Sequence, residues 1–191
     1  MARLNKGYGY GQLELNQFAA PRDGRIEAQL PLDSEVFHKG ATAADDVPAE
    51  VGMVLKVDKA GRKITTAPSE GPAEFDMYAL NYSTEHMYDE RTPQLRNFRM
   101  YPAEGGYDYM GYDDFYPRMG FLAIGDRFTT NTVELGEATF DDTIVGKFAG
   151  VGSDGYWTIG DAPEFGPVAE VVEKTTMPDG APAVKLMIVR V

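Results

Sequence analysis

The sequence has 191 residues, 43% of them hydrophobic and 12% aromatic, which is enough for a globular core without disulfide or metal cross-links. Its formal net charge of −12 argues against a surface that binds nucleic-acid phosphates or anionic lipid. The absence of cysteine excludes disulfides, thiolate nucleophiles and cysteine-ligated metal sites, and the N-terminus lacks the apolar core of a signal peptide, so we expect folding in a cytoplasm.

The first 48 residues are predicted to form an N-terminal arm, a β-hairpin and a linker. Residues 1–12 are polar and rich in glycine, so they have little to bury and are expected to be mobile when the protein is alone. They are either a frayed terminus or an extended functional arm, in which Tyr8 and Tyr10 anchor onto a neighbouring subunit.

A hairpin is predicted after the arm. Two segments that favour strands, 13–18 and 26–32, flank the turn sequence Pro21-Arg22-Asp23-Gly24. The small and polar run at 39–49 then predicts a linker. We therefore place the start of the main domain at residue 49.

Residues 49–191 are predicted to form an all-β main domain, either a small β-barrel or a β-sandwich with long loops. Its segments alternate apolar and polar residues or are rich in β-branched residues, and turns with glycine or proline separate them. The only tryptophan, Trp157, is expected in the core. One short helix is considered, after Thr92, with Pro93 at its first position. The predicted strands are 51–57, 63–66, 77–82, 119–124, 127–135, 145–151, 156–159, 168–172 and 181–191.

Two parts of this domain resemble each other at an offset of 94 residues. Val51-Gly52 corresponds to Val145-Gly146, and Gly61 corresponds to Gly155. Hairpins share turn residues by necessity, so a chance match is the rival explanation. A real repeat would mean that one hairpin–loop–strand unit is used twice, with the two units paired in a single barrel or forming two lobes.

A long loop at 101–118 lies between the two units and has neither helical nor strand periodicity. It is rich in Tyr, Gly and Asp, which suits a contact surface because a tyrosine ring buries a large area at low entropic cost. The alternatives are a protein interface, a sugar-binding platform and a loop that seals its own core. The residues predicted to bind a partner are Tyr8, Tyr10, Tyr101, Tyr107, Tyr109, Tyr112, Phe115 and Tyr116.

No catalytic constellation is visible, and we predict no catalytic residue, no cofactor and no metal. The motif G-x-G-x-x-G at 150–155 matches the dinucleotide fingerprint, but a predicted strand follows it where that fingerprint requires a helix. His38 and His86 are far apart, and the acids near His86 are typical of a solvated turn. Adjacent acids such as Asp113-Asp114 would point to opposite sides of a strand and could not face each other.

Four segments in the second half of the chain form a distinctive series of strands and turns. They read G-D-R-F-T-T-N-T-V-E-L at 125–135, V-G-K-F-A-G-V-G-S-D-G-Y-W at 145–157, P-V-A-E-V-V at 167–172 and P-A-V-K-L-M-I-V-R-V at 182–191. This series resembles the head decoration (cement) proteins of tailed bacteriophages. The similarity covers residues 119–191 and, more loosely, 49–82.

The resemblance implies a non-enzymatic β-rich protein that binds the outside of an assembled capsid, often as a trimer, and stabilises the shell. It implies the major capsid protein as partner and a place on the virion exterior after synthesis in the host cytoplasm. No nucleic-acid or membrane partner is expected. The alternatives are a phage tail, baseplate or fibre component with a carbohydrate-binding loop, and a β-barrel enzyme with an unrecognised acidic site.

The arm gives this reading a test. If residues 1–12 are a clamp, their removal should weaken capsid attachment and leave the unfolding of the free protein nearly unchanged.

Overall fold

The computed structural model of the chain describes residues 2–7, 11–38, 47–66, 77–83, 86–89, 92–97, 116–160, 162–163 and 166–191. Over these residues the fold is all-β, as predicted, and it is built from two main open sheets rather than a closed barrel. No helix within the described residues is long and apolar enough to cross a membrane.

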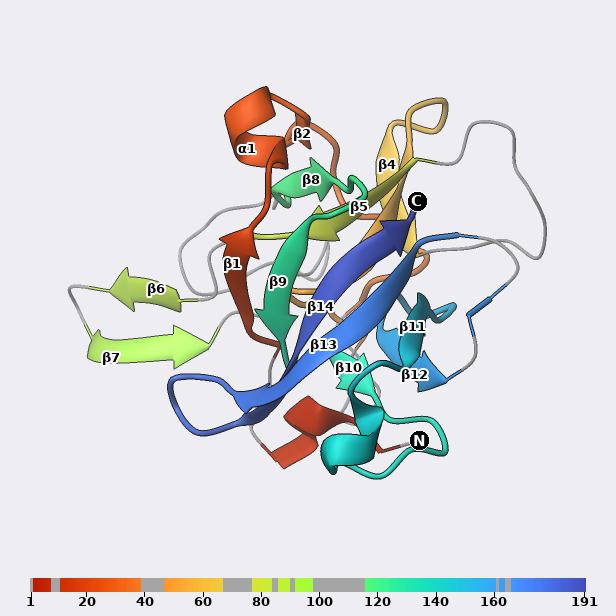
Figure 1. Ribbon diagram of the computed structural model, residues 1–191. Coiled ribbons are helices and arrows are strands. Elements are labelled where there is room, and N and C mark those ends of the chain that lie inside the picture. The colour runs from red at the N-terminus through yellow and green to blue at the C-terminus, as the bar shows by residue number, and fades with distance from the viewer. Residues whose placement is uncertain are drawn as a thin grey trace.

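The larger sheet has seven strands in the order β1-β9-β14-β13-β11-β12-β10. Its neighbours are antiparallel, except that β10 and β12 are parallel. Figure 1 shows β9, β14 and β13 side by side at the front of the molecule. The bounds are β1 (Leu13–Gln17), β9 (Arg127–Thr130), β14 (Pro182–Arg190), β13 (Val168–Thr176), β11 (Phe148–Val151), β12 (Trp157–Gly160) and β10 (Val133–Glu134).

The second sheet has five antiparallel strands in the order β2-β8-β5-β3-β4. They are β2 (Ile26–Glu27), β8 (Met119–Phe121), β5 (Tyr78–Asn81), β3 (Val54–Asp58) and β4 (Lys63–Thr66). A separate antiparallel pair consists of β6 (His86–Asp89) and β7 (Thr92–Asn97). The helix considered after Thr92 is therefore wrong: Pro93 stands near the start of a strand, a position that a sheet also tolerates.

The internal repeat is present in the topology. The strands β3 and β11 begin 94 residues apart, and so do β4 and β12. In both units the first strand pairs with the second as a hairpin and with a later strand, β5 or β13, on its other side. The two units thus share one plan, and each contributes to a different sheet.

The two sheets enclose a core in which each unit supplies side chains to the other. One hydrophobic cluster belongs mainly to the seven-stranded sheet but includes Val54 and Leu80 from the smaller sheet. The other belongs mainly to the smaller sheet but includes Tyr156. Trp157 is fully buried, as predicted, with its ring centroid 5.8 Å from that of Phe128.

The predicted hairpin near the N-terminus is wrong. Strand β1 joins the seven-stranded sheet and β2 joins the five-stranded sheet, so they do not pair with each other. Between them the turn sequence forms the short helix α1 (Ala20–Asp23), because Pro21 fits a first helical turn and Gly24, at φ 70°, ends it in the left-handed region. The division of the chain at residue 49 stays a prediction.

The segment at 2–7 packs against the sheets, so the expectation of a mobile arm is wrong for these residues. It contains the single-turn helix η1 (Leu4–Gly7), whose Leu4 is buried in the larger core cluster. Arg3 forms an isolated β-bridge with Glu134 at the edge strand β10. The polar average composition hid one buried leucine and two polar side chains, Arg3 and Asn5, that bind residues of the sheets and their flanks. Another short turn of this kind, η3 (Asp142–Ile144), precedes β11 and buries Ile144.

Candidate functional site

The residues predicted to bind a partner lie mostly outside the described residues. Tyr116 is described, and 42% of it is exposed. The structure therefore leaves the tyrosine surface as a prediction. Those that lie outside the described residues are Tyr8, Tyr10, Tyr101, Tyr107, Tyr109, Tyr112 and Phe115.

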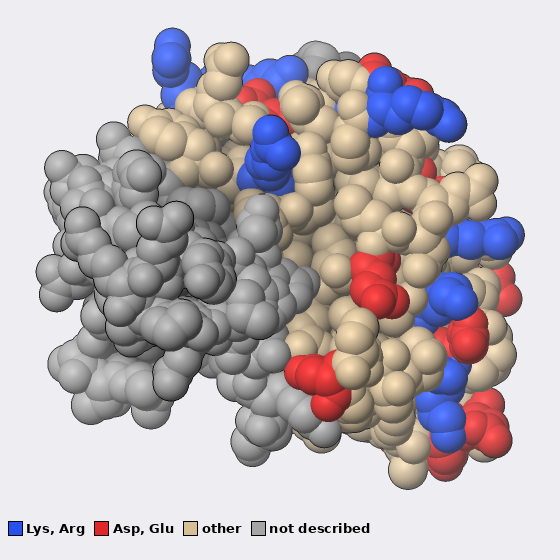
Figure 2. Space-filling model, turned by 90° about the vertical axis from the view of Figure 1, so that its left-hand side faces the viewer, with Lys and Arg blue, Asp and Glu red and all other residues tan. Residues whose placement is uncertain are grey.

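The described part of one face of the molecule carries acids and bases without separating them by sign. Figure 2 shows Lys and Arg interspersed with Asp and Glu over the described part of one face. Local ion pairs reflect this mixing, for example Lys185 with Glu173 and Lys174 with Asp142. Such exposed pairs contribute roughly 0–1 kcal/mol each to stability, so they indicate an ordinary solvated surface.

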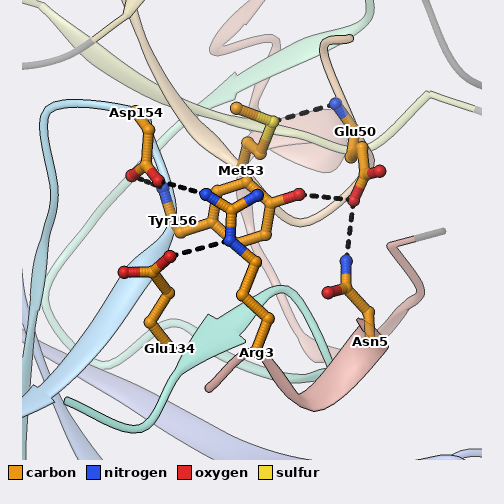
Figure 3. A network of polar contacts seen from close by, with 7 residues as sticks. All are labelled: Arg3, Asn5, Glu50, Met53, Glu134, Asp154 and Tyr156. Atoms are coloured by element: carbon orange, nitrogen blue, oxygen red, sulfur yellow. Dashed lines mark hydrogen bonds and ion pairs between the residues drawn. The ribbon is translucent and has the colours of Figure 1, made fainter. Parts of the chain in front are cut away.

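The most elaborate polar arrangement lies where the N-terminal segment meets both sheets (Figure 3). The guanidinium of Arg3 lies over the ring of Tyr156, with its carbon 3.9 Å from the ring centroid. Arg3 Nε donates to Glu134 Oε1 and Nη2 donates to Asp154 Oδ2, both at 2.7 Å. One side chain near the N-terminus therefore holds β10 and the β11–β12 turn together.

Beneath this arginine lies a buried carboxylate. Glu50 is only 2% exposed, and its Oε2 accepts hydrogen bonds from the Tyr156 hydroxyl and from Asn5 Nδ2, both at 2.7 Å. The backbone of Glu50 is held as well, since its carbonyl accepts from Asn81 Nδ2 at 2.9 Å. A buried carboxylate is costly unless hydrogen bonds compensate it, and these donors do so. We call Arg3, Asn5, Glu50, Glu134, Asp154 and Tyr156 the clasp.

Burial and the neighbouring charges in the clasp set the protonation states of Tyr156 and Arg3. Burial, the nearby charge of Glu50 and the hydrogen bond to it raise the pKa of the Tyr156 phenol well above its ordinary value. Burial disfavours the charge of Arg3, but the hydrogen bond to Glu134 and the surrounding negative groups raise the pKa of Arg3 overall. The phenol therefore stays neutral and the guanidinium stays charged near neutral pH. A neutral, capped phenol is a hydrogen-bond donor and not a nucleophile.

A second polar cluster joins the start of β1 to the end of β9. Thr130 Oγ1 donates to the backbone carbonyl of Gln12 at 2.6 Å, and the backbone amide of Gln12 donates to Asn131 Oδ1 at 2.6 Å. Thr132 Oγ1 donates to the carbonyl of Val51, also at 2.6 Å. The buried T-T-N-T run at 129–132 thus uses its polar groups to hold backbone from two distant segments.

A groove of about 600 Å³ lies between β1, α1 and the turn before β9. Its wall includes the exposed apolar side chains of Leu15 and Ile124 and the exposed Arg22. Of the two acids in its wall, Asp126 is buried and accepts hydrogen bonds from the backbone amides of Ala19 and Ala123, so it shapes the groove. The groove has a mixed wall, in which Asp23 pairs with the bases Arg22 and Arg25, and it has no recognisable reactive group.

Other side chains suited to catalysis or metal binding are sparse among the described residues. Among the described residues no group of three or more His, Cys, Asp or Glu side chains could hold a metal ion. The glycine motif at 150–155 lies in a strand–turn–strand, as predicted, with the amide of Gly155 donating to the carbonyl of Gly152 at 2.9 Å. The side chain of His86 lies outside the described residues.

The clasp was missed by sequence reasoning, because its six members are scattered from position 3 to position 156. One local signal existed: Glu50 is a lone acid between Ala49 and Val51, at the entrance to a predicted strand. Comparison of the chain with protein-family models, with curated proteins and with solved structures finds no match in any of the three.

Proposed function

We propose that the chain is a non-enzymatic structural protein of a bacteriophage virion, which binds the outer surface of the capsid and stabilises the shell. The observation that carries the proposal is the position of the four segments that resemble decoration proteins. They contain β9, β10, β11 and β14 and the first residues of β12 and β13, so all four lie in the seven-stranded sheet. A resemblance concentrated in one continuous sheet supports a shared architecture more than scattered matches would.

The use of polar residues supports a structural role. The polar side chains of the clasp and of the 129–132 run bind one another and the backbone. Enzyme sites instead hold polar groups toward an open pocket where a substrate can enter. In the described residues the polar chemistry holds the fold together, as a protein that resists mechanical load requires.

The proposed partner is the major capsid protein, and the proposed state on the capsid is a homo-oligomer such as a trimer. The net charge of −12 keeps the protein from binding the packaged nucleic acid. The contact surface remains the tyrosine set predicted from the sequence, of which Tyr116 is exposed.

The test is to mix the purified protein with capsids assembled without it and to image the particles by electron microscopy. We expect saturable binding at a fixed number of copies per capsid, and a higher temperature of capsid disruption. Capsids that already carry the protein are the control and should take up none. Absence of binding at saturating protein would overturn the proposal, and a signal on a glycan array would then favour a tail or fibre component.

A further inference from the structure

The edge of the seven-stranded sheet at β1 is open. Strand β1 pairs with β9 on one side, and no strand among the described residues pairs with the other side of residues 14–17. All four of these residues are exposed. An open edge presents unpaired backbone N–H and C=O groups, so it is a template for a further strand.

At this edge an apolar side chain on the core-facing side of the sheet is not buried. Leu15 is paired with Phe128, which is fully buried in the core, and directly paired residues point to the same face of a sheet. Leu15 therefore points to the core face, yet 43% of it is exposed. Ile124, which is 71% exposed, lines the same groove. An added strand would cover apolar surface that the described residues leave uncovered.

We propose that this edge pairs with β1 of a second copy of the chain, antiparallel about a two-fold axis at Leu15. In this register Leu15 meets its own counterpart and Glu14 faces Asn16. At the axis an apolar side chain meets an apolar side chain, and no like charges are directly opposed, which would be unfavourable. The strand is thus complementary to itself, as a two-fold interface requires.

The charges on the outer face support the same arrangement. Glu14 is paired with Thr129 and so shares the outer face with Arg127, and neither charge has an ion-pair partner within the described structure. The two-fold axis places Glu14 of each copy on the side where the other copy carries Arg127. The edge therefore offers one unpaired charge of each sign to an identical edge.

The contact is short, which sets the expected affinity. A bulge between Leu15 and Gln17 turns the end of β1, so the ribbon is limited to a few residues around Leu15. Such an interface falls below the ~1,000 Å² of a typical stable dimer, so the dimer is weak and concentration-dependent. Each copy carries a net charge of −12, so long-range repulsion opposes the dimer and added salt strengthens it.

Sedimentation velocity of the full chain, from low to high micromolar concentration and at two salt concentrations, tests the dimer. We expect a shift toward the dimer mass with concentration and with salt. Leu15→Lys should abolish the shift by opposing two charges at the axis. Val145→Lys is the matched control and should dimerise like the parent chain, since Val145 is 46% exposed and precedes β11, which three strands separate from β1. A parent chain that stays monomeric, or a Leu15→Lys variant that dimerises, would overturn the proposal.

Cysteine cross-linking tests the register. The chain has no cysteine, so Leu15→Cys carries a single thiol. Directly opposed β-carbons are ~4.5–5.5 Å apart, close to disulfide geometry, whereas residues two positions from the axis are too far from their own counterparts. We expect a covalent dimer of Leu15→Cys on mild oxidation and little of Gln17→Cys or Val145→Cys. Equal amounts of covalent dimer from all three variants would overturn this register. Binding of a different protein at β1, with no self-association of this chain, would overturn it as well.

Discussion

At the scale of single residues, the hydrogen bond between Tyr156 and Glu50 is the most consequential contact of the clasp. The substitution Tyr156→Phe keeps the ring beneath Arg3 and removes the hydroxyl. We expect the free energy of unfolding at pH 7 to fall by about 1–3 kcal/mol, because Glu50 then has one donor fewer in a buried site. Urea denaturation measures the change. Tyr116→Phe is the control, since its exposed hydroxyl should cost almost nothing.

The same tyrosine gives a pH dependence with a definite sign. Its pKa is raised in the folded protein, whereas an unfolded tyrosine titrates near pH ~10. Above pH ~10 the folded state keeps a proton that the unfolded state has lost, so the contribution of Tyr156 to stability decreases as the pH rises. The difference in unfolding free energy between the parent chain and Tyr156→Phe should therefore narrow from pH 8 to pH ~11. A constant difference would contradict the assigned environment.

Gly52 is required both by its backbone and by its neighbours. Its φ is +87°, and a β-carbon there would lie 2.4 Å from Thr130 Oγ1 and 2.8 Å from Thr132 Oγ1. Gly52→Ala should therefore cost about 2–4 kcal/mol, through backbone strain and displacement of two threonines that hold distant segments. Gly24 has a φ of +70° and nothing within 4 Å, so Gly24→Ala should cost only the strain, about 1–2 kcal/mol. Thermal unfolding of both variants separates the two causes, and equal losses would contradict the crowding at Gly52.

At the scale of elements, the N-terminal segment acts as part of the fold. Leu4 is buried in the core, Arg3 binds Glu134 and Asp154, and Asn5 binds Glu50. Leu4→Ala should therefore lower the free energy of unfolding by about 2–4 kcal/mol, and a chain that begins at residue 8 should lose more. This reverses the expectation from the sequence that removing residues 1–12 leaves unfolding unchanged.

The exposed Ile124 provides the comparison for Leu4. Ile124→Ala removes an aliphatic side chain from the surface and should change stability by less than about 0.5 kcal/mol. Chemical denaturation of both variants, analysed with a common denaturant slope, measures the two losses of unfolding free energy. If Leu4→Ala were as mild as Ile124→Ala, the segment would be a removable arm after all.

Local pattern predicted most strands of the two sheets but not every pairing. The strands β3, β4, β5, β11, β12 and β14 follow from apolar alternation and turn residues, which are local signals. The partners of β1 and β2 lie about a hundred residues along the chain, so no short-range pattern could identify them. The clasp was hidden for the same reason, because it exists only after distant segments have packed. Only the burial of Trp157 was anticipated at the residue level.

At the scale of the whole molecule, the two units of the repeat share a single core. The amide of Val54 donates to the carbonyl of Gly155 at 2.9 Å, and Val54 packs in the cluster of the opposite sheet while Tyr156 packs in the other. Neither sheet can therefore open without exposing side chains of both units. The two units, which the sequence relates only by a weak match at an offset of 94 residues, stabilise each other because each contributes a side chain to the other's core cluster.

This exchange predicts that the molecule unfolds as one cooperative unit. Trp157 fluorescence reports the seven-stranded sheet, and Leu55→Ala removes a fully buried side chain from the core of the other sheet. That substitution should cost about 2–5 kcal/mol and move the urea midpoint equally by Trp157 fluorescence and by far-ultraviolet circular dichroism. Val145→Ala, at an exposed site, should move neither probe by a comparable amount. A Leu55→Ala variant in which the circular dichroism transition shifted while the Trp157 transition stayed in place would mean that the two sheets unfold separately.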